Sequence, residues 1–95
     1  MEQPDAAVLI SGDPEVVGCT LAEGSALLNM RTYVYYALND VGAFVWDALR
    51  EPVAFGSLVE RVCSEFGAPA ARVEADLAQL VRQMDAAGLV QCRQP

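Results

Sequence analysis

The spacing of apolar residues changes at Asn39, and this change restricts the folds that the chain can adopt. Before Asn39, short apolar runs are separated by turn residues, and the last of them is rich in the aromatic and β-branched residues that strands favour. After Asn39, apolar residues recur at the spacing of amphipathic helices. Strands followed by helices predict an α+β fold in which the helices cover one face of a sheet.

The apolar runs of the first half predict a small antiparallel sheet. The first run ends at Ser11-Gly12-Asp13-Pro14, a cluster typical of turns, and the next two end at Ala22-Glu23-Gly24 and at Arg31-Thr32. In the last run, alternation places Val34, Tyr36 and Leu38 on the face expected to be buried, and Tyr33 and Tyr35 on the other face. Three strands are expected, at 16–21, 25–30 and 33–38, with a fourth candidate at 7–10.

The second half predicts three helices. Asn39 or Asp40 is expected to cap the first, and Pro69 to open the third. The second is expected over about 55–66, with a capping box at 57–60, and Leu89-Val90 forms either a short strand or a packed tail. The apolar stripe of the third helix is Val73, Leu77, Leu80, Val81 and Met84.

This order of elements is the makeup of a winged helix-turn-helix-like domain, with a three-stranded antiparallel sheet followed by three α-helices. No repeat or low-complexity segment interrupts it, so one domain is expected over residues 1–95, with an ordered core of about 7–91.

Composition restricts the partners of the chain. It carries 13 acidic residues against 6 basic ones, all arginine, for a net charge of -7. Binding to nucleic acid or to an anionic membrane depends on Lys and Arg, so neither partner is expected. The apolar runs are too short to span a bilayer, and the acidic N-terminus is unlike a signal peptide. A cytoplasmic protein is therefore expected.

The residues that are missing exclude most catalytic chemistry. The sequence has no His and no Lys, so it offers no Ser-His or Cys-His couple, no Schiff base and no P-loop lysine. Cys19, Cys63 and Cys92 lack the spacing of a zinc site and are expected to be free thiols. The chain is therefore expected not to be an enzyme and to need no metal or other cofactor.

A set of short motifs carries a resemblance to a known family. They are Leu27-Leu28-Asn29, Thr32, Tyr35-Tyr36-Ala37-Leu38-Asn39, Val41-Gly42-Ala43, Val45-Trp46, Leu49, Leu58-Val59, Phe66, Val73-Glu74-Ala75-Asp76, Leu80 and Gly88-Leu89-Val90. Together they resemble the PqqD family, whose members include the leader-binding domains called RiPP recognition elements. Tyr33 departs from the pattern, because the family often has Gly there, and a different hairpin turn is therefore expected. Ala54 replaces a common capping Ser or Thr.

The resemblance implies a non-catalytic adaptor, with lasso-peptide biosynthesis as the favoured branch and pyrroloquinoline quinone biosynthesis as the next. Such proteins bind the leader of a ribosomal precursor and present it to a leader peptidase and a macrolactam cyclase. The leader is expected to add antiparallel to the third strand, in a cleft walled by the third helix. The candidate peptide-binding residues are Tyr33, Val34, Tyr35, Tyr36, Asp76, Leu77, Leu80, Gln83 and Met84.

Two alternatives remain open at this point. A winged-helix nucleic-acid-binding domain has the same order of elements, although Glu74, Asp76 and Asp85 accompany Arg72 and Arg82 in the third helix. A dimerisation module is the other, with the exposed sheet edge pairing with its own copy.

Overall fold

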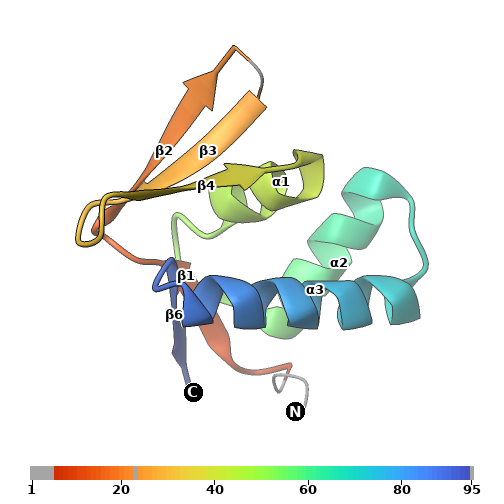
Figure 1. The fold of residues 1–95 in the computed structure, drawn as a ribbon. Helices are drawn as coiled ribbons and strands as arrows, with labels where there is room; N and C mark the ends of the chain where they lie inside the picture. The colour runs from red at the N-terminus through yellow and green to blue at the C-terminus, as the bar shows by residue number, and fades with distance from the viewer. Residues whose placement is uncertain (1–5, 23, 95) are drawn as a thin grey trace.

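The computed structural model describes residues 6–22 and 24–94, and within them three helices and six short strands. Residues 1–5, on which the comparison with a signal peptide rests, lie outside the described residues. The α+β class with antiparallel pairing and three helices is confirmed. The expected single sheet preceding all the helices is wrong, because two three-stranded sheets form and two strands lie later in the chain (Figure 1).

The first sheet joins the two ends of the described chain. Its central strand β1, Leu9–Gly12, pairs antiparallel with β5, Val53–Ala54, and with β6, Val90–Arg93. Strand β5 lies between the first two helices and β6 follows the third, so the residues after Leu89 are strand rather than tail. Strand β5 has two residues and is not stable without β1, which explains why its local sequence does not predict it, whereas a strand after Leu89 was one of the two expected alternatives.

The second sheet forms a continuous antiparallel meander. Strands β2 (Val16–Leu21), β3 (Gly24–Asn29) and β4 (Val34–Leu38) pair in the order β2-β3-β4, so β4 lies at an edge. Tyr33 in the β3–β4 turn has φ 59°, the left-handed conformation that glycine adopts most readily. The tyrosine therefore occupies a backbone conformation that is more favourable for glycine.

The helices begin and end close to the predicted residues. Helix α1 spans Asp40–Ala48, α2 Phe55–Phe66 and α3 Ala70–Ala86. The Asn39 side chain accepts a hydrogen bond from the Gly42 backbone N–H at 2.8 Å, so the predicted cap is confirmed. The predicted capping box at 57–60 is wrong, because α2 already starts at Phe55 behind Ala54, which has no side chain able to cap.

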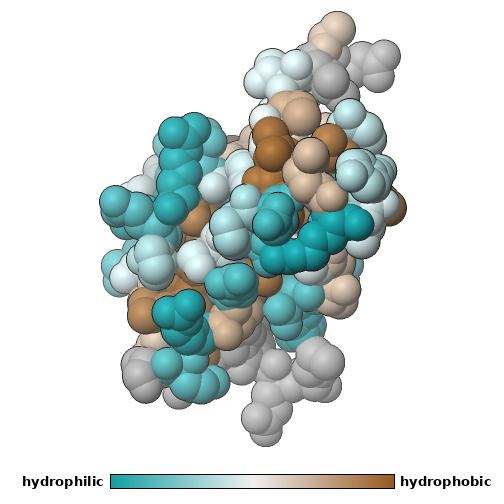
Figure 2. Space-filling view, turned by 90° about the vertical axis from the view of Figure 1, so that its left-hand side faces the viewer, coloured by the Kyte–Doolittle hydropathy of each residue, from teal (hydrophilic) through white to brown (hydrophobic). Residues whose placement is uncertain are grey.

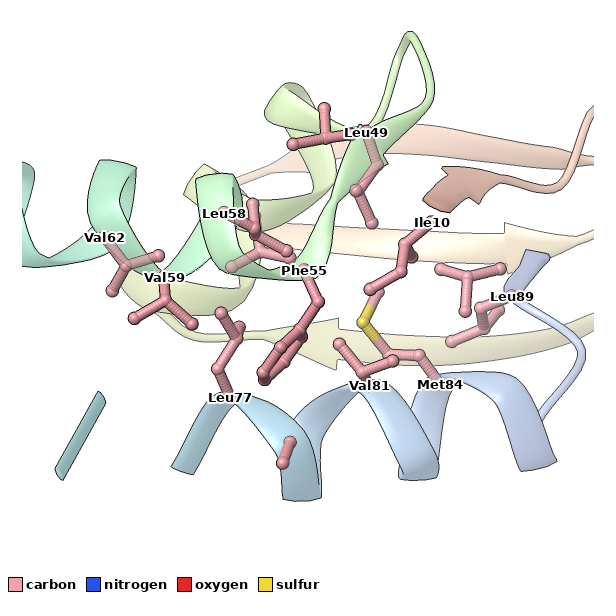
Figure 3. Packing of buried hydrophobic residues seen from close by; sticks show 14 of the residues in the cluster. Ile10, Leu49, Phe55, Leu58, Val59, Val62, Leu77, Val81, Met84 and Leu89 are labelled. Carbon is pink, nitrogen blue, oxygen red and sulfur yellow. The ribbon is translucent and has the colours of Figure 1, made fainter. Parts of the chain in front are cut away.

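The core lies where α3 packs against α1, α2 and strand β1. Figure 3 shows Leu77, Val81 and Met84 of α3 directed toward Phe55, Leu58 and Ile10. The apolar stripe predicted for α3 therefore packs mostly against the other elements, with Leu80 at its border. This packing holds α3 at a fixed position beside the second sheet.

The indole of Trp46 in α1 packs against two glycines. A Cβ atom at Gly12 would lie 2.8 Å from the ring, and one at Gly18 would lie 3.0 Å from its Nε1 atom. Gly12 belongs to β1 and Gly18 to β2, so one ring contacts both sheets. The ring can approach this closely only because glycine has no side chain at these positions.

None of the helices among the described residues is long and apolar enough to cross a bilayer.

Candidate functional site

Strand β4 pairs on one side with β3, and its other side is an edge of the sheet. The pattern of hydrogen bonds identifies the backbone groups at that edge. Met30 donates its N–H to the carbonyl of Glu15 at 2.8 Å, one step beyond the Val16–Asn29 pair. Since hydrogen-bonded and non-hydrogen-bonded pairs alternate in an antiparallel ladder, Asn29 directs its backbone groups away from β2 and toward β4.

The same alternation extends to β4. Val34, Tyr36 and Leu38 are in register with Asn29, Leu27 and Ser25, so their backbone groups face β3. Tyr35 and Ala37 therefore present their N–H and C=O groups at the open edge. These four groups are a template on which an extended peptide can form a new ladder.

An apolar cavity lies beside the end of this strand. It has a volume of about 90 Å³, several times the roughly 10 to 15 Å³ that one water needs. This size suits a small apolar side chain. The cavity joins the start of α1 to α2 and α3, and it is lined by Val41, Val62, Val73, Asp76, Leu77 and Leu80.

The strand and α3 run in opposite directions along the two sides of this region. At one end, Val41 follows β4 and shares the cavity with Leu77 and Leu80. At the other end, Asn29, the partner of Val34, donates from its side-chain amide to the carbonyl of Ala87 at 3.3 Å. The cavity itself is lined from α1, α2 and α3 only. We use the name groove for the region between β4 and α3, from the Ala87 end to the cavity, as the candidate place for a bound peptide; in Figure 1, β4 lies above α3.

The residues predicted for the site in β4 and in the turn before it are mostly exposed. Tyr33 is 74% exposed and Tyr35 60% exposed, and Val34 is exposed as well. Tyr36 is half-buried and packs against the core. The strand therefore contributes its edge and exposed aromatic surface, whereas Tyr36 mainly anchors the strand.

The five predicted α3 residues divide between groove and core. Leu80 is half-buried and lines the cavity, with exposed Asp76 at its rim. Leu77 also lines the cavity but is only 2% exposed. Met84 is 3% exposed and packs within the core. Gln83 is exposed and lines none of the described cavities.

Sequence reasoning missed four residues of the site. Val41, Val62 and Val73 line the cavity from three different helices, and Ala37 supplies two of the four edge groups. The alternation of β4 places the Ala37 side chain on the same face as that of Tyr35, but the direction of its backbone groups follows only from the pairing with β3. The meeting of the three valines depends on helix packing, which no local pattern shows.

Asp76 is the charged residue of the cavity rim. Its carboxylate lies 3.7 Å from Nε of Arg72, one turn earlier, as the sequence spacing predicts. Both side chains are more than 70% exposed, so this pair contributes little to stability. The carboxylate is therefore available to a basic group on a ligand.

The outer face of the second sheet is a further apolar surface. Val17, Leu28 and Tyr35 form one row across its three strands, and Val17 and Tyr35 are exposed. Figure 2 shows brown and tan residues gathered over this sheet in its upper part, with teal residues below and beside them. A peptide added to β4 would extend this face by alternate side chains.

A polar network holds the β3–β4 turn near the end of α3. Asn29 is 3% exposed, and its Oδ1 atom accepts the Arg31 N–H at 2.9 Å. The Asp13 carboxylate, 8% exposed, accepts from the Glu15 N–H at 2.8 Å and from the half-exposed Arg31 guanidinium at 3.0 Å. The Asp13 N–H in turn donates to the Leu89 carbonyl at 3.0 Å.

These bonds lower the pKa of Asp13 below its usual 3.8, chiefly through the hydrogen bond from Arg31 and then through that from Glu15. A carboxyl whose pKa is lowered by folding stabilises the fold above its unfolded pKa and loses this contribution as the pH falls through its folded pKa. Asp13→Asn is expected to lower the free energy of unfolding by about 1 to 2 kcal/mol at neutral pH. The difference from the unmodified protein should shrink below pH 3.8.

Urea denaturation over a range of pH measures this difference. Glu74→Gln, at an exposed position of α3, is the control, and its effect should be small throughout. A gap between Asp13→Asn and the unmodified protein that stays constant into strong acid would show that the carboxylate is not the stabilising group.

Among the described residues, no cluster of His, Cys, Asp and Glu is arranged to hold a metal ion. The groove therefore combines unpaired backbone groups, an apolar cavity and one carboxylate at its rim. A free strand edge next to apolar pockets is the geometry of proteins that bind extended peptides.

Comparison with known proteins agrees with this class. The family model described as coenzyme PQQ synthesis protein D (PqqD) matches residues 24–90. That match covers well over half of the sequence, and the chain belongs to the PqqD family. The resemblance noted from the sequence motifs is thereby confirmed. A search of the curated proteins found no significant match.

Two solved structures are similar over most of their length. "TbiB1 in complex with the TbiA(beta) leader peptide" has a TM-score of 0.76 and 26% identity, and the match covers 85% of this chain and 94% of that one. "Lasso peptide synthetase B1 complexed with the leader peptide" has a TM-score of 0.75 and 24% identity, and covers 86% of this chain and 96% of that one. At its lower identity, the second match supports the fold alone.

Proposed function

We propose that this protein is a RiPP recognition element that binds the leader peptide of a ribosomal precursor, of the lasso type, along the edge of β4. The observation that carries the proposal is the open backbone edge of Tyr35 and Ala37 beside the cavity of α3. Its fold is also similar to that of proteins solved with leader peptides bound. The protein would present the leader to a leader peptidase and a macrolactam cyclase in the cytoplasm.

The binding energy has two sources in this geometry. Four backbone hydrogen bonds, at a net 0.5 to 1.5 kcal/mol each, give roughly 2 to 6 kcal/mol. Ordering a disordered leader offsets most of that gain. One apolar side chain in the cavity adds about 1.5 to 3 kcal/mol. The backbone edge therefore sets the direction of the leader, and the cavity supplies its register and selectivity.

The leader is expected to run antiparallel to β4, as the strands of this sheet do. Its N-terminal part then lies beside Leu38 and the cavity, and its C-terminal part leaves past the β3–β4 turn. Alternate leader side chains would face α3, where a basic group can pair with Asp76. Tyr33, at the exit, would contact the downstream part.

The alternative of a nucleic-acid-binding domain is less favourable. Glu74, Asp76 and Asp85 of α3 are exposed, and their negative charges would repel the phosphates of a duplex brought against this helix. The proposed role is non-catalytic, because the groove supplies contacts and no nucleophile–base pair.

Isothermal titration with a synthetic leader tests the proposal. The probe is the leader of a precursor encoded beside this protein's gene, and a scrambled leader of the same composition is the control. We expect saturable binding in the micromolar range or tighter by the purified chain, with no peptide cleavage or ATP hydrolysis. Absence of heat and saturation up to hundreds of micromolar, or equal binding of the scrambled peptide, would refute it. Sedimentation with and without leader separates capture from self-pairing.

A further inference from the structure

The two walls of the groove are held together differently at its two ends. At the cavity end, α1 continues directly from β4 and packs with α2 and α3, so the chain itself connects the walls. At the turn end, β4 is preceded by a hairpin turn and α3 ends at Ala86. The Asn29 side chain bridges this second end through its 3.3 Å hydrogen bond to the Ala87 carbonyl.

The amide of Asn29 is placed to act as a rigid spacer. Its Oδ1 atom accepts a hydrogen bond from the Arg31 N–H, and its backbone carbonyl accepts one from the Tyr33 N–H at 2.7 Å. Both oxygen atoms of the residue therefore bind the turn. Its Nδ2 atom reaches the other wall, and a Cβ at Gly88 would lie only 3.4 Å from it. A buried amide with all these partners has one favourable position.

The Asp13–Arg31 ion pair reinforces the same end of the groove. It ties the turn to the segment before β2, and that segment is bonded to Leu89 just after α3. The turn is thus linked twice to the end of α3, by Asn29 to Ala87 and by way of Asp13 to Leu89.

We infer that Asn29 is a positioning residue that sets the separation of β4 from α3 at the turn end of the groove, and thereby the affinity for the downstream part of the bound peptide. The inference rests on the proposed function. It predicts a local effect: loss of the Asn29–Ala87 bond weakens contacts beside Val34 and Tyr35 and leaves those at the Leu77–Leu80 end unchanged.

The experiment compares two peptides on three proteins by fluorescence anisotropy. The peptides are the full leader used above and the same leader shortened from its C-terminus, so that it covers only the cavity end. Asn29→Asp keeps an acceptor for the Arg31 N–H, removes the donor to Ala87, and places a carboxylate at the negative end of α3. Val53→Ala, in β5 of the other sheet, is the control for general destabilisation.

With Asn29→Asp, the full leader is expected to bind about 5- to 30-fold more weakly, and the shortened leader within about 2-fold of the unmodified protein. Val53→Ala should lower Tm without changing the ratio of the two affinities. If Asn29→Asp weakens both peptides equally, or if Val53→Ala reproduces its pattern, the residue is merely structural and the inference fails. If the unmodified protein binds neither peptide, the proposed function itself fails.

Discussion

Replacement of Ala37 by proline is expected to weaken leader binding by about 10- to 150-fold, equivalent to about 1.5 to 3 kcal/mol. The N–H of Ala37 faces the open edge of β4, and proline removes it while leaving a carbonyl of the leader without its partner. The β3–β4 ladder should survive, since proline is tolerated on edge strands where its nitrogen faces solvent. Titration of the full leader measures the loss, with Tm as the measure of folding.

Two controls isolate the backbone effect. Ala37→Val changes the side chain at the same exposed position and keeps the N–H, so binding should stay within about 3-fold. Thr20→Pro removes an outward-facing N–H from β2, at the opposite edge of the same sheet, and should leave the affinity unchanged. If Thr20→Pro weakens binding and Ala37→Pro does not, the leader pairs with β2 instead.

The position of proline within β4 also matters. The N–H of Val34 faces β3 in register with Asn29 and donates to the Thr32 hydroxyl at 3.4 Å, so Val34→Pro would disturb the β3–β4 turn and would leave the open edge unchanged. Tyr35→Pro, like Ala37→Pro, acts at the open edge. Proline substitutions at adjacent residues of one strand therefore remove N–H groups that point in opposite directions, and only the hydrogen-bonding pattern shows which direction each one takes.

Replacement of Leu80 by aspartate is expected to weaken leader binding by about 30- to 150-fold, or about 2 to 3 kcal/mol. The change removes an apolar wall of the cavity and places a second carboxylate near Asp76. An apolar leader side chain would then lose its contact with an apolar wall that is shielded from water. Because Leu80 is only half-buried, the fold should tolerate the change better than it would at Leu77. The same titration gives the effect.

Gln79→Asp is the matched control, because it adds the same charge at the next residue of α3, on an exposed position. It should change the affinity by less than about 3-fold. Leu80→Met preserves the apolar volume and should bind nearly as well as the unmodified protein. Equal losses for Leu80→Asp and Gln79→Asp would mean that net charge, and not the cavity, controls binding.

The helices were predictable because their signals are local. Asn39 caps α1 as expected, α2 spans the predicted 55–66, and α3 starts just after Pro69. Strands β2, β3 and β4 also lie within one or two residues of their predicted bounds. In each case the apolar period and the turn residues act over a few positions, and tertiary packing agrees with them.

The first sheet and the interior of the groove were not predictable in this way. Strands β5 and β6 exist because they pair with β1, about forty and eighty residues away in the chain. The stripe of α3 shows which side chains face inward, yet packing against α1 and α2 determines that Met84 is core and Leu80 borders a cavity. Whether a side chain is buried or borders a cavity depends on the neighbouring elements, and the apolar periodicity of one helix carries no information about them.

By itself, the sequence determined the α+β class, the extents of the helices and of the β2–β4 meander, and the family of the chain. The tertiary structure alone decided which backbone groups of β4 face outward, how a cavity forms where three helices meet, and how Asn29 joins the β3–β4 turn to the end of α3. The physical reason is range: helix periods and caps act between near neighbours, whereas edges, cavities and bridging hydrogen bonds arise only when distant segments are brought together.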